Sequence, residues 1–147
     1  MIDVVRKLED MERRLRRVET LESGGGGTFT PTYFGSSVAG STTYAGVRYG
    51  YYIVSGGVCH IWLRVGWSAT TATGVGLVGG LPLVAAADAE IAMATFSQDY
   101  AYTGAGLRAY LFGGLLHLTL FDQVVGAFSG ANVDAAATLI ISGAYPI

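Results

Sequence analysis

The chain has 147 residues, of which 51% are hydrophobic and 14% are charged, and its net charge is −2. Twelve of its twenty charged residues fall within the first 23 positions, which leaves a nearly neutral body that we expect to hide surface against copies of itself. The body has no basic stripe, which argues against nucleic-acid binding, and the single Cys59 excludes a disulfide framework or a thiolate metal cage within one chain.

The first 23 residues predict a short parallel coiled coil. Apolar residues alternate at spacings of three and four, which is the seam of a left-handed coiled coil, and charged residues flank it. The seam residues are Met1, Val4, Leu8, Met11, Leu15 and Val18. Lys7 and Arg14 at g face Glu12 and Glu19 at e of the following heptad, so a parallel bundle would pair them between chains.

Three chains are the expected number. Leucine at a with valine at d shifts the preference away from dimers. Residues 14–19 also resemble the short trimer-specifying pattern of parallel coiled coils, and residues 7–12 repeat it with lysine in place of arginine. A helix of three heptads is marginal alone, so the body must trimerise as well. The predicted organisation is a stalk over residues 1–23, a glycine linker over 24–27 and a head over 28–147.

The sequence of the head predicts many short strands separated by glycine-rich turns. Residues 58–67 alternate with period two, and their apolar face predicts a core strand. That face consists of Cys59, Ile61, Leu63, Val65 and Trp67. Residues 49–54 precede it through a Ser-Gly-Gly turn, which predicts a hairpin. A second hairpin is expected from residues 107–112 and 115–121, and further strands at 75–78, 90–97 and 138–142. The fold class is mainly β, a jelly-roll-like antiparallel sandwich.

No membrane insertion and no cofactor is expected. The uncharged stretch 65–87 is long enough to span a bilayer, but its glycine, threonine and serine content suits strands. His60 or His117 could hold a metal ion on a three-fold axis, although a hydrogen-bonded or surface histidine is the default, so no metal is predicted. The head's five carboxylates are scattered along the sequence, so the sequence predicts no enzyme, with polysaccharide cleavage as the minor alternative.

Tyrosines are the other candidates for a site. A segment containing Gln98, Asp99, Tyr100 and Tyr102 is typical of a loop tip that recognises a surface, because tyrosine is rigid and carries a hydroxyl. Packing of tyrosines in the sandwich or across a trimer accounts for most of them equally well.

The chain resembles the small fibre or spike proteins of tailed bacteriophages. The resemblance rests on the heptads closing at 18–22, the segment 28–35, the strands at 49–54 and around Trp62, the Gly-Leu-Pro element at 80–82 and the ending at 143–145. One departure is the Ser-Gly-Gly turn at 55–57, where Gly-Asn is expected.

The resemblance implies a homotrimeric virion protein on the tail or capsid surface, made in the host cytoplasm. Its implied partners are other virion proteins through the stalk, and a host surface glycan or protein through the head. The leading interpretation is a tail fibre or receptor-binding protein that mediates attachment. The alternative is a capsid decoration or head-fibre protein without a recognition role.

Overall fold

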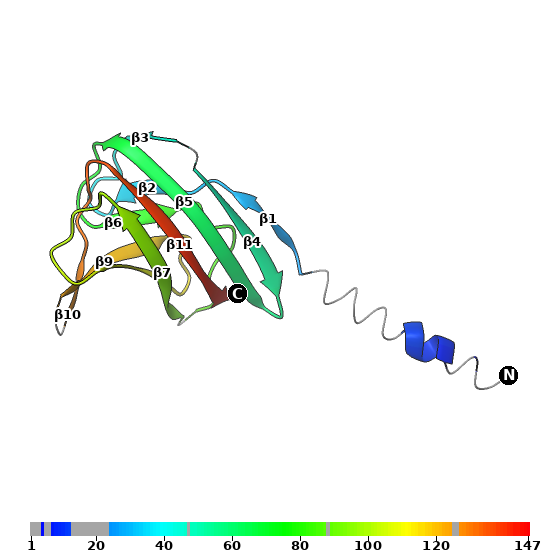
Figure 1. Cartoon of the computed structure of the whole chain (residues 1–147). Coiled ribbons are helices and arrows are strands. Elements are labelled where there is room, and N and C mark those ends of the chain that lie inside the picture. The colour runs from blue at the N-terminus through cyan, green and yellow to red at the C-terminus, as the bar shows by residue number, and fades with distance from the viewer. Residues whose placement is uncertain (1–3, 5–6, 13–23, 47, 88, 125–126) are drawn as a thin grey trace.

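The computed structural model describes residues 4, 7–12, 24–46, 48–87, 89–124 and 127–147. Over these residues the chain folds into eleven antiparallel strands that form one curled sheet (Figure 1). The strands are β1 (Gly26–Phe29), β2 (Thr32–Gly35), β3 (Thr42–Tyr44), β4 (Tyr49–Ser55), β5 (Val58–Thr70), β6 (Gly76–Gly79), β7 (Glu90–Gln98), β8 (Leu107–Phe112), β9 (Leu118–Val124), β10 (Ala127–Gly130) and β11 (Ala137–Pro146). The predicted mainly β class is confirmed.

Strand β7 turns the sheet from one layer into the other. Its residues 90–93 pair with β8, and its residues 94–98 pair with β11. Layer A therefore holds β1, β4, β5, β11 and β3, while layer B holds β8, β9, β10, β6 and β2. Because one strand runs through both layers, the two faces belong to a single curled sheet, and the expected jelly-roll sandwich is not confirmed.

The two ends of the sheet meet. β1 and β2 lie at opposite ends of the strand order, yet only residues 30 and 31 separate them in the chain. The Thr42 hydroxyl donates to the Tyr33 carbonyl, and the Tyr33 N–H donates to the Tyr44 hydroxyl, so β3 is tied to β2 across the gap. β3 thereby covers part of the free edge of β2, which would otherwise invite pairing with another chain.

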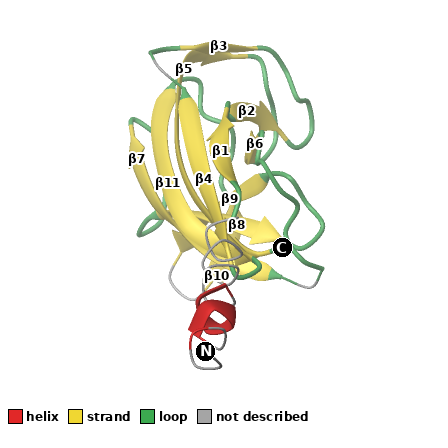
Figure 2. Ribbon diagram, turned by 90° about the vertical axis from the view of Figure 1, so that its right-hand side faces the viewer, coloured by secondary structure: helices red, strands yellow, loops and turns green. Residues whose placement is uncertain are grey.

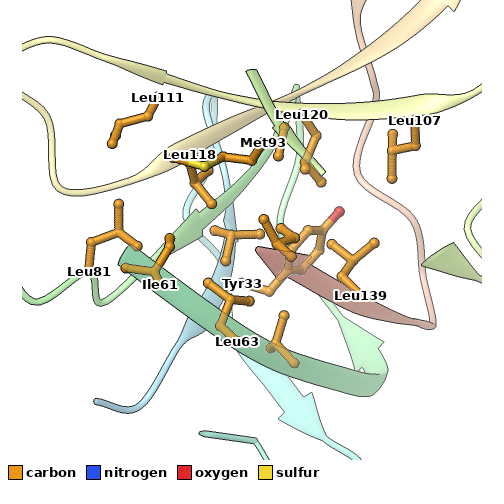
Figure 3. Close-up of a cluster of buried hydrophobic side chains, with 14 of the residues drawn as sticks. Tyr33, Ile61, Leu63, Leu81, Met93, Leu107, Leu111, Leu118, Leu120 and Leu139 are labelled. Atoms are coloured by element: carbon orange, nitrogen blue, oxygen red, sulfur yellow. The ribbon is translucent and has the colours of Figure 1, made fainter. Parts of the chain in front are cut away.

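The core lies between the layers and follows the predicted alternation of β5. Its five residues predicted to face inward are all buried, including the Cys59 thiol. Figure 3 shows Ile61 and Leu63 of layer A facing Leu118 and Leu120 of layer B. Since strand side chains alternate between faces, this parity alone sends the intervening side chains outward.

The two predicted hairpins form. β4 pairs with β5 through Gly56 and Gly57, whose φ angles of 57° and 76° are those that a two-residue primed turn requires. β8 pairs with β9, but β9 begins at Leu118 and not at residue 115. Strands β1, β2, β3 and β10 were not expected, because their three or four residues show no alternation, whereas the equally short β6 was expected from the apolar run at 75–78. The last two glycines of the expected linker belong to β1, where Gly26 is paired with Ile53.

Little of the expected stalk lies within the described residues. Val4 and residues 7–12 are helical, and Figure 2 shows this segment outside the sheet. Coiled-coil pairing is not shown. Among the described residues, no helix is long and apolar enough to cross a membrane.

Candidate functional site

A buried aromatic cluster joins the two layers. Tyr33 of β2 stacks on Trp67 of β5, with ring centroids 3.6 Å apart and an interplanar angle of 13°. The Asp134 N–H donates to the Tyr33 hydroxyl, which donates to the Tyr100 hydroxyl over 2.9 Å, which in turn donates to the Asn132 carbonyl over 2.7 Å. The Trp67 indole N–H donates to the Asp134 carbonyl. Burial raises the pKa of both tyrosines. The three rings are buried and their polar atoms are hydrogen-bonded, so this cluster is a structural element of the core.

This cluster removes Tyr100 from the predicted recognition loop. Tyr100 is only 5% exposed, because its hydroxyl reaches inward to Tyr33 and the segment near Asn132. The other three residues of the prediction, Gln98, Asp99 and Tyr102, are exposed. Asp99 has a φ angle of 63°, which turns the chain sharply between the end of β7 and the buried Tyr100. Tyr102 lines a polar groove of about 330 Å³ together with Phe96 and Arg108.

Asp122 of β9 fixes the far side of the same loop. Its buried carboxylate accepts hydrogen bonds from the Thr103 N–H, the Thr103 hydroxyl and the Gly104 N–H. Burial acts to raise the pKa of Asp122, but these hydrogen bonds outweigh it and hold the pKa below its usual value. The Asp134 carboxylate similarly accepts from the N–H groups of Ala101 and Ala136. Both acids therefore anchor loops.

The outer face of layer A carries an aromatic platform, which we define as the exposed Tyr49 and Tyr51 and the half-buried Trp62. Tyr51 lies opposite Trp62 in the β4–β5 register, with ring centroids 5.5 Å apart and an interplanar angle of 19°. The Tyr49 ring lies 5.3 Å from the same indole. Beside the platform runs a shallow groove of about 460 Å³, lined in part by Ile53 and His60. Rigid rings beside a groove are well suited to contacting a partner.

The platform went unrecognised in the sequence, although a signal was present. Trp62 is out of phase with the core face of its strand, and Tyr49 and Tyr51 are two apart on the preceding strand. Pairing the two strands through the Gly56–Gly57 turn already places all three rings on one face.

The histidines lie apart. His60 is exposed at the groove, whereas His117 is half-buried with its ring 5.8 Å from that of Phe34. Over the described part of the chain, no group of three or more histidine, cysteine, aspartate or glutamate side chains could hold a metal ion.

The described residues of the predicted stalk expose their apolar side chains. Val4, Leu8 and Met11 are 61%, 56% and 58% exposed, and Lys7 and Glu12 are exposed beside them. The remaining predicted trimerisation residues lie outside the described residues; these are Arg14, Leu15, Val18 and Glu19.

Neither a family model nor a curated protein matches the sequence. The fold, however, is shared with a tailspike. The crystal structure of the Dettilon tailspike protein (gp208) matches with a TM-score of 0.66 over 83% of this chain, at 16% sequence identity. This chain spans 23% of the length of that protein. At this identity the match establishes a common fold.

The match corrects one expectation from the sequence, that the chain is not an enzyme. Tailspikes often hydrolyse glycans, so scattered acids in the sequence are no ground for excluding catalysis. The match is distant and assigns no activity to this chain.

Proposed function

We propose that the chain is a receptor-binding protein of a phage tail, and that its β head attaches the particle to the host surface. The observation that carries this proposal is the fold shared with a tailspike over 83% of the chain. The resemblance of the sequence to phage fibre and spike proteins supports the same assignment independently.

The contact surface in this proposal is the aromatic platform with its groove. Antiparallel sheets that face water usually carry polar side chains on that face, whereas here the large hydrophobic side chains of Tyr49, Tyr51 and Ile53 are exposed. Exposed apolar surface of this kind marks a binding site. Host glycans or proteins are the partners that this surface would take.

The proposal includes a parallel homotrimer that is aligned by the stalk and attached through it to other virion proteins. An exposed apolar seam on the helical segment is stabilised only when another helix covers it. Three heads on one stalk would convert weak single contacts into firm attachment.

Adsorption of phage particles tests the attachment role. Particles that carry Trp62→Ala should adsorb to host cells more slowly than wild type, whereas particles that carry Val84→Ala, an exposed residue outside the platform, should adsorb normally. Normal adsorption by particles that lack the chain altogether would refute attachment. Electron microscopy of particles with labelled chains separates a tail location from the alternative capsid location.

Sedimentation equilibrium tests the oligomeric state. A trimer mass is expected for the full chain, and Leu8→Asp should lower it by placing charge in the seam. A stable monomer or dimer of the unaltered chain would contradict the trimer.

A further inference from the structure

A second aromatic site lies on the outer face of layer B. Glu90 of β7, Tyr110 and Phe112 of β8, and Phe121 of β9 line a pocket of about 120 Å³. The register explains the grouping: Glu90 lies opposite Phe112, while Tyr110 and Phe112 are two residues apart and so share a face. Phe121 reaches this face from the next strand, diagonally across from Tyr110.

The three rings enclose space instead of forming a flat surface. The Phe121 ring lies 5.4 Å from that of Tyr110 at 82°, and 6.2 Å from that of Phe112 at 65°. All three side chains are half-buried. The platform on layer A differs in shape, since Tyr51 and Trp62 are nearly parallel and border a groove almost four times larger.

The charge at the pocket favours ligands of one sign. Among the described residues that line the pocket, Glu90 is the charged one, in a head that carries few charges. Arg108 lies opposite Phe121 in the β8–β9 register and on the same face as Tyr110, and its side chain lines the separate groove beside Tyr102. A negative carboxylate beside three aromatic rings favours a positive ligand with an apolar surface.

We infer that this pocket binds an alkylated ammonium group, of which the trimethylammonium head of choline is the simplest example. Such a cation is attracted to ring faces within about 6 Å of their centroids, and its methyl groups fill an apolar pocket that water solvates poorly. Glu90 supplies the counter-charge at the exposed rim. The small volume suits a head group and excludes an extended oligosaccharide.

The site deepens the proposed function, on which its biological meaning rests: it would recognise host surface polymers that carry choline-like groups. The measurement of binding itself does not depend on that role, because it uses the purified full chain and a small molecule.

The test is calorimetric titration of the full chain with choline chloride at constant ionic strength, with 3,3-dimethyl-1-butanol as the neutral ligand of equal shape. Choline should bind saturably and roughly tenfold more tightly than the neutral alcohol, because only choline gains the cation–π and carboxylate attraction.

Two variants locate the site. Glu90→Gln keeps the shape and removes the charge, and Phe121→Leu keeps an apolar side chain and removes the ring; each should weaken choline binding several-fold while the circular dichroism spectrum stays that of wild type. The matched control Asp99→Asn, an exposed acid outside the pocket, should leave binding unchanged.

Three results would overturn the inference: no saturable binding of choline, equal binding of the neutral alcohol, or a preference for a monosaccharide such as glucose. If the purified chain does not bind choline, the particle can still need the chain for adsorption. If particles that lack the chain adsorb normally, the purified chain can still bind choline. The two proposals therefore fail separately.

Discussion

Stacked tryptophan–tyrosine pairs occur both between the two layers of the sheet and on its outer face. Trp67 and Trp62 stand on one strand, five positions apart, and each stacks on a tyrosine. Trp67 and Tyr33 are buried, and their polar atoms are hydrogen-bonded to the segment that contains Asp134. Trp62 and Tyr51 point outward beside a groove. Ring content alone therefore does not locate a binding surface; strand parity and the partners of the polar atoms do.

Substitutions of Trp67 and Trp62 should give the largest difference in the free energy of unfolding. Trp67→Ala leaves a cavity between the layers and should lower the free energy of unfolding by about 3–5 kcal/mol. Trp62→Ala removes an outer ring and should cost about 1 kcal/mol. Guanidinium titration at one fixed protein concentration measures both, since association would change apparent stability with concentration. Equal losses would mean that the platform is part of the folded core, which would contradict its role as a contact surface.

Substitutions of Tyr100 and Tyr102 should give a smaller difference in the free energy of unfolding. Tyr100→Phe removes a hydroxyl that joins Tyr33 to the Asn132 carbonyl, and leaving those buried groups unpaired should cost about 1–3 kcal/mol. Tyr102→Phe changes an exposed side chain and should stay within about 0.5 kcal/mol of wild type. The same denaturant titration compares them, and a silent Tyr100→Phe would show that the inner hydroxyl network does not hold the layers together.

Substitutions of Asp122 and Asp99 should give the smallest difference in stability, and this difference should depend on pH. Because hydrogen bonds hold the pKa of Asp122 below its value in the unfolded chain, its contribution to stability is present above the unfolded pKa of about 3.9 and is lost as pH falls through the folded pKa. Asp122→Asn should therefore be less stable than wild type at pH 7, with the gap narrowing in acid. Asp99→Asn, at an exposed position whose positive φ suits asparagine, should stay within about 0.5 kcal/mol of wild type at pH 7. Thermal melts from pH 7 to pH 2.5 would measure the stability difference between Asp122→Asn and wild type. A difference that does not change with pH would mean that the substitution destabilises the loop through its shape and not through the lost charge.

Much of the head was predictable because its signals are local. The alternation of residues 58–67 predicted β5 and its inward face, and adjacent glycines predicted the turn after β4. Strands β1, β2 and β3 were missed because each is too short for a period and is held by a distant partner. The inward direction of Tyr100 was missed for the same reason: its hydrogen-bond partner Tyr33 lies 67 residues away.

The sequence by itself determined the class of the head and the core face of its main strand, since period two is a property of neighbouring residues. The heptad seam of its first residues stays a prediction. Only the tertiary structure decided that β7 runs from one layer into the other, and that the chain passes between the two edges of the sheet in two residues. It also brought Glu90 beside three rings from two other strands. Those arrangements depend on pairing between segments far apart in the chain, and no local pattern encodes them.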